Sequence, residues 1–435
     1  MESLIEKILD EMNMQRAVKR VFDNKGAAGV DDIPAEDAYL EFYDHGQEAM
    51  EAIRNGAYKP KPIRRVYIPK PNGEQRPLGI PTVMDRIIQQ AVAQVLSSMY
   101  DSTFSEYSYG FRPNRSCHMA IEKSLEYLNS GYEWVVDLDI RKYFDTVNHD
   151  KLISILRERM NDARTLHLIR SFLQAGVMED GLVSETEAGV PQGGPLSPIL
   201  SNIYLDKLDK ELEARGLRFA RYADDCNIFV KSRHAADRVM KTVSSWLERK
   251  LFLHVNAEKS KVVRPNDSHF LGFKYWKCNG KWRVTVSDDR KQRLMDKVKV
   301  ITCRRRAQAN TLDEMFLKLN QTIIGWINYF SIADMKGFIR QFGEWMRHKV
   351  RVVILKQWKR PRTIYRNLMK LNTMFKCKMS DEDIFKVANS RLGWYRRATG
   401  NVINYLISPS VLAIKNGDRP GLVNPLKLYL SKHVN

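Results

Sequence analysis

The spacing of hydrophobic residues changes near residue 285. Before that point, alternating apolar residues such as Val66 and Ile68 predict a β-hairpin within residues 58–81. After it, apolar residues recur at helical spacing from 312 to 330, which predicts a helix with one buried face. The sequence therefore predicts a mixed α and β region followed by an all-helical one, with a domain boundary between them.

The same periodicity predicts most other elements. Helices are expected before residue 60, on both sides of a glycine-rich turn at 24–32. The remaining predictions are a hairpin turn at 71–73, helices over 82–100, 116–129, 199–215 and 235–250, a strand over 132–140 with helices from there to about 175, a hairpin around Asp224, and a β segment at 270–276.

The composition is that of a folded protein. The 435 residues are 43% hydrophobic, enough for two or three domains with cores of their own. No stretch approaches about 20 uninterrupted apolar residues, so we expect no transmembrane helix, and the N-terminus lacks a signal-peptide core. Five scattered cysteines form no CxxC pair, which favours a reducing compartment and argues against structural zinc. We therefore expect a cytoplasmic protein without a membrane partner.

Positive charge is concentrated in the second part of the chain. Lys and Arg number 71 against 51 Asp and Glu, a net charge of +20. Residues 336–370 contain eleven basic residues and one acid, Glu344, interleaved with Trp345, Trp358 and Tyr365. A basic surface can serve solubility alone, and an anionic membrane is the main rival partner, but this concentration favours nucleic acid. Binding should then weaken strongly with salt, because neutralised phosphates release counterions.

The acidic pair Asp224-Asp225 lies inside a segment of strand-forming residues. A turn would explain such a pair, and two other acidic pairs occur in the chain, so the dipeptide alone indicates little. A second predicted strand supplies the context, because period-2 alternation places Asp137 and Asp139 on one of its faces. If this strand lies beside the hairpin, three or four carboxylates converge there.

Converging carboxylates repel one another, and burial raises their pKa values. Divalent cations compensate such a cluster, and carboxylates with water suit Mg²⁺, which completes its shell with substrate phosphates. Two Mg²⁺ ions about 3.5–4 Å apart would activate the attacking oxygen and stabilise the leaving oxygen in phosphoryl transfer. Together with the basic charge, this chemistry predicts a nucleotidyltransferase.

The order of motifs resembles that of group II intron-encoded reverse transcriptases/maturases over nearly the whole chain. The resemblance is carried by NKGAAGVD (24–31) for the N-terminal extension, IPKPNGEQRPLGIPTVMDRIIQQAV (68–92) for the fingers, YGFRPNRSCHMAI (109–121) for the next block, DLDIRKYFDTVNHDKL (137–152) for the first catalytic acid, GVPQGGPLSPILSNIYL (189–205) for template and nucleotide binding, RYADDCNIFV (221–230) for the catalytic hairpin, LHVNAEKSKVV (253–263) for the next palm block, FLGFKY (270–275) for the primer grip and GWINYF (325–330) for the maturase domain.

This resemblance implies a right-hand polymerase of the α+β class, with fingers and an antiparallel palm sheet followed by an all-helical thumb/maturase domain. The implied division is an N-terminal extension at 1–60, fingers and palm at 61–284, thumb/maturase at 285–380 and a small C-terminal, candidate DNA-binding segment at 381–435. Larger family members carry a C-terminal endonuclease with cysteine pairs. This chain has no CxxC pair, so we expect no endonuclease activity.

The catalytic residues implied by the resemblance are three aspartates and a lysine. Asp139 and Asp224 match the principal ligands of the two Mg²⁺ ions, and Asp225, also in the metal-binding triad, either assists them or only supports the turn. Lys259 matches the general acid that protonates the leaving pyrophosphate, with Lys261 as its nearest competitor. Asp137 shares the face of Asp139 but lies outside the matched triad.

Further residues match the substrate contacts of the family. A Lys and an Arg beside a turn are usually solvated, and a strand aromatic is often core, so each of these matches has a plainer alternative. They are Lys70 and Arg76 for the triphosphate, Phe144 as the gate against a ribose 2′-hydroxyl, Gln192 near the sugar, Tyr222 against the primer terminus or pocket floor, Gly193 and Gly194 near the template, and Phe270, Leu271 and Gly272 as the primer grip.

The implied activity is RNA-directed DNA synthesis that copies intron RNA, combined with RNA binding that assists splicing and retrohoming. The implied partners are group II intron RNA, template RNA with a DNA primer, target DNA and dNTPs. Two alternatives remain open. One is a reverse transcriptase of a non-intron bacterial retroelement used in defence or diversity generation, and the other is a mainly RNA-binding splicing factor.

Overall fold

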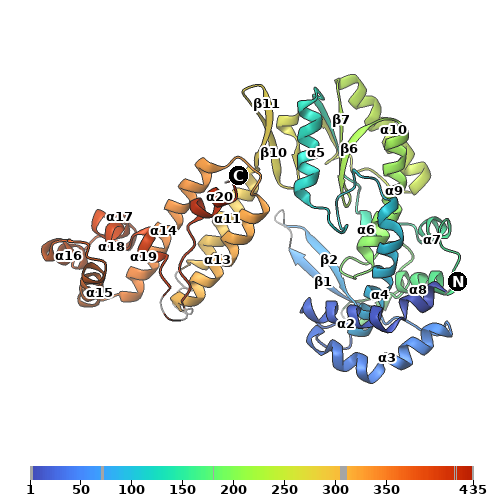
Figure 1. Cartoon of the computed structure of the whole chain (residues 1–435), viewed down its shortest axis with the longest axis horizontal. Coiled ribbons are helices and arrows are strands. Elements are labelled where there is room, and N and C mark those ends of the chain that lie inside the picture. Colours follow the sequence, from blue (N-terminus) through green and yellow to red (C-terminus); the bar gives the residue numbers. More distant parts are fainter. Residues whose placement is uncertain are drawn as a thin grey trace. The chain divides into compact units, whose positions relative to one another are not determined.

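The computed structural model describes residues 3–69, 73–179, 181–303, 311–415, 417 and 419–433. The chain divides into two compact units, Met1–Phe270 and Leu271–Asn435. Their helices and strands carry the labels of Figure 1.

Unit 1 begins with helices around the glycine-rich turn, as the sequence predicts. These helices are α1 (Leu4–Ile8), α2 (Glu11–Asp23) and α3 (Ala38–Arg54). Helices α2 and α3 pack against α4 (Val83–Tyr100), whose first turn is capped by the Thr82 hydroxyl. Short 3₁₀ turns lie at Ala35–Asp37, Asp101–Thr103 and Pro265–Asp267.

A four-stranded sheet follows, in the order β2-β1-β4-β5. The predicted hairpin is confirmed by the antiparallel pair β1 (Ile63–Pro69) and β2 (Gln75–Ile80), although residues 71 and 72 of its predicted turn lie outside the described residues. Strand β4 (Val177–Glu179) runs parallel to β1 and pairs with β5 (Leu182–Ser184). These two strands were not predicted, because three residues are too few to show a period.

The second sheet of unit 1 has the order β6-β7-β3-β8, with every pair antiparallel. Its strands are β6 (Arg218–Tyr222), β7 (Asp225–Val230), β3 (Trp134–Leu138) and β8 (Lys261–Val263). Helices α5 (Cys117–Asn129), α9 (Ser197–Ala214) and α10 (Arg233–Leu251) pack against it (Figure 1). The remaining elements are α6 (Tyr143–Thr146), α7 (His149–Arg157), α8 (Ala163–Leu173) and β9 (His269–Phe270).

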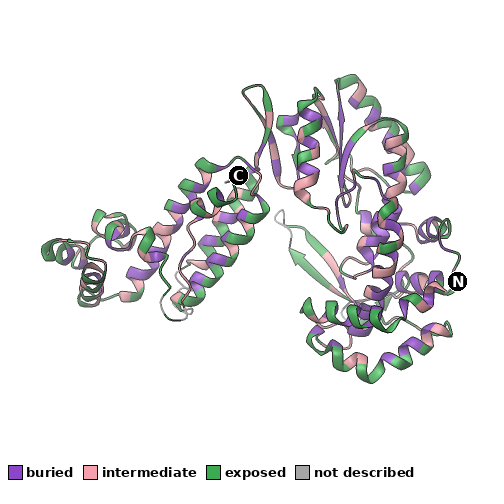
Figure 2. Cartoon of the chain, viewed as in Figure 1, coloured by how far each residue is buried: buried purple, intermediate pink, exposed green. Residues whose placement is uncertain are grey.

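Alternation along the paired strands separates an apolar side of this sheet from the side that carries the acidic residues. Val136 and Leu138 on β3 oppose Ile228 and Cys226 on β7, and all four belong to the buried core of unit 1. Figure 2 shows these strands largely buried, whereas most of the fingers strand β1 is exposed. The polar residues at the intervening positions are therefore held on a rigid, well-packed sheet.

Unit 2 begins with a hairpin and is otherwise helical in its described part. The hairpin joins β10 (Phe273–Cys278) to β11 (Lys281–Val286). The helices are α11 (Asp288–Ile301), α13 (Leu312–Tyr329), α14 (Lys336–Trp358), α15 (Pro361–Met374), α16 (Asp381–Ala388), α17 (Trp394–Thr399), α18 (Asn401–Leu406), α19 (Pro409–Leu412) and α20 (Pro425–Ser431). The apolar stripe predicted over 312–330 is confirmed as core, because Met315, Phe316, Leu319, Ile323 and Ile327 are all buried.

The division between the units falls earlier than the change of composition near residue 285. The β10–β11 hairpin belongs to unit 2 because the Asp334 nitrogen donates to the Val284 oxygen at 2.8 Å, and the Thr285 hydroxyl donates to the Asp334 oxygen at 2.9 Å. The C-terminal segment joins the same unit, since α20 packs on α13 and α14. Within the described ranges, no helix is both long enough and apolar enough to cross a membrane.

Candidate active site

The pairing of β3 with β7 brings the acidic residues of two distant segments together. Asp137 lies opposite Asn227, so Asp225, two residues before Asn227, points to the same side of the sheet. Asp139 follows Asp137 at the next same-side position, just beyond the end of β3. Asp224 lies in the turn that joins β6 to β7, because Tyr222 pairs directly with Asp225. The strand arrangement on which the predicted acidic cluster depends is thus present.

The cluster perturbs its own ionisation. Burial raises the pKa of Asp224 and the negative charge of Asp139 raises it further, whereas the charge of Arg76 lowers it. Asp225 is exposed as a residue, but its carboxylate loses hydration among the surrounding atoms, and this raises its pKa to about 6, helped by Asp224 and Asp139. These like charges are held together without enough positive charge to balance them.

Asp137 has a different environment, although it shares the face of Asp139. Its carboxylate accepts a 2.8 Å hydrogen bond from the Ser268 hydroxyl, and Lys261 is its partner across the strand pair with β8. Burial raises the pKa of Asp137 to about 7, against the effects of Ser268 and Lys261. Asp137 therefore already has partners within the protein.

The oxygen-rich donor set suits Mg²⁺ only when other ligands take part. Among the residues that the structure describes, no three His, Cys, Asp or Glu side chains form a group able to hold a metal ion alone. Mg²⁺ commonly binds through one or two carboxylates and completes its shell with water and substrate phosphates. The crowded, incompletely neutralised carboxylates around Asp224 fit that mode of binding.

The turn that carries Asp224 is strained and closely packed. Ala223 has a φ of +57°, a conformation that favours glycine. Gly110 lies directly against this turn, because a Cβ at residue 110 would stand 2.3 Å from the Ala223 nitrogen. The side-chain amide of Asn202 donates to the Gly110 oxygen at 2.8 Å and fixes that segment in place. The YGF motif thus packs against the hairpin that carries Asp224.

Sequence reasoning missed the residue that anchors this turn, Arg221. Its side chain is completely buried, and it donates to the Ala223 oxygen at 2.8 Å, the Asp209 carboxylate at 2.7 Å and the Ser108 hydroxyl at 2.7 Å. A signal was present in the sequence. Arg221 lies two residues after the buried Phe219, on the same face of the strand, and Asp209 lies among the buried leucines of α9. Two opposite charges at core positions indicate a buried ion pair.

The structure distinguishes Lys259 from its competitor Lys261. The positive charge of Lys259 lowers the pKa of Asp225, whereas that of Lys261 lowers the pKa of Asp137. The residue after Lys259 is tied to the end of β3, because the Asp139 nitrogen donates to the Ser260 hydroxyl at 2.9 Å. The charge of Lys259 therefore acts on Asp225, a member of the predicted metal-binding triad, and the charge of Lys261 acts on Asp137.

The predicted substrate residues of the fingers are only partly described. Arg76 is exposed on β2, and its charge reaches both Asp224 and Asp225. Lys70 lies outside the described residues. The Gln192 loop is fixed against the same strand, because the Gly79 nitrogen donates to the Gln192 oxygen at 2.7 Å. Gly193 allows this approach, since it has a φ of +121° and a Cβ there would lie 2.4 Å from the Gly79 oxygen.

The two aromatic candidates are both half-buried. Phe144 packs edge-on against Tyr143 at 5.1 Å, and its backbone oxygen accepts a 2.6 Å hydrogen bond from the Val190 nitrogen. Tyr222 lies 6.5 Å from the ring of Phe111, measured between centroids. Each ring therefore retains an accessible surface.

The predicted primer grip spans the division between the two units. Phe270 is buried at the end of unit 1, and Leu271 and Gly272 open unit 2 with φ values of +54° and +84°. Arg290 and Phe330 leave little room at Gly272, since a Cβ there would lie 3.1 Å from the Arg290 Nε. The grip segment thus has a constrained backbone.

Comparison with known proteins places the chain in a family. Residues 68–275 match the family model described as reverse transcriptase (RNA-dependent DNA polymerase), and residues 291–372 match the group II intron maturase-specific domain. Protein YkfC of Escherichia coli is 34% identical over 312 residues, covering 62% of this chain and 82% of that protein. The chain belongs to the group II intron reverse transcriptase/maturase family.

Other relatives of this reverse transcriptase/maturase are encoded by introns. Group II intron-encoded protein LtrA of Lactococcus lactis is 40% identical over 208 residues, which cover 47% of this chain and 34% of LtrA. The putative COX1/OXI3 intron 2 protein of Saccharomyces cerevisiae is 36% identical, with 50% of this chain and 24% of that protein covered. The match to LtrA thus spans about a third of its length.

The two family matches coincide with the two charged regions of the reverse transcriptase/maturase. The acidic cluster and every described candidate site residue, from Arg76 to Gly272, fall inside the polymerase match. Most of the basic segment 336–370 lies on α14 and α15, inside the maturase-specific match.

Proposed function

We propose that this chain is an RNA-directed DNA polymerase that copies intron RNA into cDNA and binds intron RNA to assist splicing and retrohoming. The observation that carries the proposal is the pairing of β3 with β7, which puts Asp139 and Asp225 on the same side of the palm sheet, next to the turn that carries Asp224. The raised pKa values of Asp224 and Asp225 support a cation-binding role, because a bound cation would relieve their mutual repulsion.

In this proposal Asp139 and Asp224 hold two Mg²⁺ ions, with Asp225 assisting or supporting the turn. When bound, the ions supply charge stabilisation for the attacking primer 3′-oxygen and for the leaving pyrophosphate. Arg221 and Gly110 keep the carboxylates at a constant position, since both contact the turn that carries Asp224. Positioning of this kind is a large part of phosphoryl-transfer catalysis.

The remaining residues serve the nucleotide and the proton. Arg76, together with Lys70, binds the triphosphate of the incoming dNTP. Phe144 excludes a ribose 2′-hydroxyl, and Gln192 lies near the sugar. Lys259 donates a proton to the departing pyrophosphate, which its closeness to Asp225 supports. Tyr222 lines the pocket, and residues 270–272 hold the primer strand.

Unit 2 supplies the nucleic-acid surface of the proposal. The basic residues of α14 and α15 would contact phosphates of intron RNA and of the template–primer duplex. The segment from residue 381 onward would contact target DNA. The maturase-specific match over residues 291–372 supports an RNA-binding role for this unit.

A primer-extension assay tests the proposal. Wild-type protein should extend a DNA primer on an RNA template with dNTPs and Mg²⁺. Asp224→Asn should lower the rate roughly 10³-fold, about 4 kcal/mol of transition-state stabilisation. Asp288→Asn, which makes the same change in an exposed acidic pair on α11, is the matched control and should retain activity. Equal cDNA from wild type and Asp224→Asn would show that the carboxylate assignment is wrong.

A further inference from the structure

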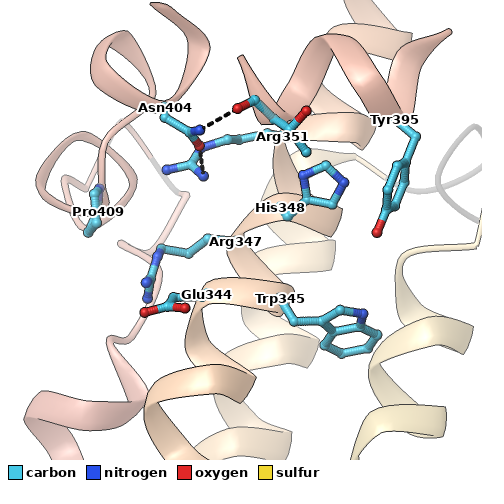
Figure 3. Close-up of a pocket in the computed structure, with 9 residues that line it drawn as sticks. Glu344, Trp345, Arg347, His348, Arg351, Tyr395, Asn404 and Pro409 are labelled. Carbon is cyan, nitrogen blue, oxygen red and sulfur yellow. Dashed lines mark hydrogen bonds between the residues drawn. The ribbon is translucent and has the colours of Figure 1, made fainter. Parts of the chain in front are cut away.

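A cavity of about 500 Å³ lies within unit 2, between α14 and the segments α17 to α19. Its size is in the range of small-ligand sites. Figure 3 shows side chains from both sides directed toward it. The principal lining residues are Trp345, Arg347, His348, Arg351, Tyr395 and the acidic Glu344.

Two arginines and one acid, Glu344, line the cavity, so positive charge is in excess there. Arg347 is half-buried, and burial lowers its pKa. Within the described ranges its guanidinium forms no ion pair and no hydrogen bond, although the charge of Glu344, which also lines the cavity, partly balances it. A guanidinium shielded from water without a carboxylate partner is uncommon in proteins. An anionic ligand would supply the missing partner.

Arg351 is positioned to share that ligand. Its side chain is only 7% exposed, and burial together with the charge of Arg347 lowers its pKa to about 10. The guanidinium is oriented by hydrogen bonds from Nε to the Ile407 oxygen at 2.9 Å and from Nη1 to the Asn404 side chain (Figure 3). Since a guanidinium has five N–H donors, this pairing leaves donors for a bound anion.

The other part of the cavity is aromatic. The His348 ring packs edge-on against Tyr395 at a centroid distance of 4.2 Å, and Lys349 lies over the rings of both Tyr395 and Trp345. Tyr395 is nevertheless 56% exposed, so much of its surface is accessible. This wall offers accessible ring surface.

We infer that this cavity binds one unpaired nucleotide of a nucleic acid, with its phosphate at Arg347 and Arg351 and its base against the aromatic wall. Arginine forks suit phosphate oxygens. Unpaired bases stack on aromatic side chains. A bare anion would satisfy the arginines but not the aromatic wall. The inference deepens the proposed function. It rests on one part of that proposal, the binding of nucleic acid by unit 2.

Binding of two matched hairpins tests the inference with the full-length chain. The probes are a fluorescein-labelled RNA hairpin with one bulged uridine and the same hairpin without the bulge, each also made as DNA. Wild type should bind the bulged RNA roughly tenfold more tightly. The same preference on the DNA pair would identify unpaired DNA as a second source of the nucleotide.

Two variants with matched controls assign the preference to the cavity. Arg347→Gln should reduce the ratio of the two dissociation constants toward one, whereas Arg340→Gln, the same change at an exposed position of α14, should weaken both probes alike. Tyr395→Ala should also remove the preference, whereas Tyr405→Ala, at a tyrosine 55% exposed on α18, should keep it. The tyrosine pair keeps the test valid if Arg347→Gln fails to fold.

Either of two outcomes would overturn the inference. One is equal binding of bulged and paired hairpins by wild type, and the other is an unchanged ratio in both Arg347→Gln and Tyr395→Ala. Primer extension by wild type is measured alongside. Its absence would contradict the proposed polymerase function without affecting the bulge preference, so the two failures are distinguishable.

Discussion

The palm of unit 1 and the cavity of unit 2 concentrate charge of opposite sign in the same way. In the palm, burial and like charges raise the pKa values of Asp224 and Asp225. In the cavity, burial lowers the pKa values of Arg347 and Arg351. Both shifts favour the neutral form, which indicates charge that the fold does not compensate. The sign of the charge then accounts for the ligands that we propose, a cation in the palm and an anion in the cavity.

A second contrast shows that burial of charge is not sufficient evidence of a binding site. Arg221 is more deeply buried than Arg347, yet its donors are directed at Asp209, Ser108 and Ala223. Arg347 has no such partners in the described part of the chain. A fully paired buried arginine supports the structure, whereas an unpaired one has capacity left for a ligand.

The largest expected effect comes from breaking the buried ion pair between Arg221 and Asp209, which lies next to the turn that carries Asp224. Asp209→Asn leaves the Arg221 charge buried without its carboxylate, so unfolding free energy should fall by about 3–5 kcal/mol. Glu211→Gln on the same helix breaks a surface pair with Arg215 and should cost about 0.5 kcal/mol. Urea unfolding measures both variants. Similar losses in the two would mean that the Arg221 network does not stabilise the palm.

The same variant tests whether Arg221 positions the catalytic turn. Under conditions where Asp209→Asn stays folded, kcat for primer extension should fall while KM for the template–primer changes little. A merely structural role predicts instead that the folded fraction retains the wild-type kcat.

The next effect concerns the nucleotide side of the acidic cluster. Phe144→Ala removes the half-buried ring proposed to exclude a 2′-hydroxyl, and discrimination between dNTP and rNTP should fall by roughly tenfold or more. Tyr143→Phe, which keeps the adjacent buried ring and removes only its hydroxyl, is the control. Primer extension with each nucleotide separately measures the ratio. Unchanged discrimination in Phe144→Ala would assign Phe144 to packing alone.

A smaller effect is expected at the basic surface of unit 2. Neutralising three exposed basic residues of α14 and α15, Arg340, Arg362 and Lys370, should reduce the slope of log K against log salt for RNA binding. The slope should decrease by about 0.7–0.9 for each phosphate that the variant no longer neutralises. Filter binding at several salt concentrations gives the slope. An unchanged slope would mean that RNA does not follow this surface.

The smallest effect is on stability as pH changes. Because the folded-state pKa of Asp225 is raised to about 6, its favourable contribution to the free energy of unfolding is present at low pH and is lost as the pH rises through about 6. Melting temperature should therefore fall by a few degrees, about 2–4 °C, between pH 4 and pH 7. Added Mg²⁺ should reverse the loss at the higher pH. Asp225→Asn should flatten the dependence, and an equally steep profile in that variant would contradict the assignment.

Local chemistry explains why much of the fold could be predicted. The helices predicted over 82–100 and 116–129 agree with α4 and α5. Their hydrophobic periodicity and their N-cap residues, Thr82 and Ser116, are local features of a single segment. The hairpin around Asp224 was predicted for the same reason. The short strands β4 and β5 were not, since their pairing with β1 is decided by a distant segment.

The sequence by itself determined the order of motifs, the residue types of the acidic cluster and the uneven distribution of positive charge. These follow from spacing and composition, which tertiary structure does not alter. Only the tertiary structure decided that Arg221 would anchor the Ala223 turn, that Lys259 rather than Lys261 would affect Asp225, and that Arg347 would face a cavity without a partner. Each of these three features depends on groups that the fold brings together from distant segments. A local sequence pattern therefore does not indicate which charged side chains remain unpaired in the folded chain.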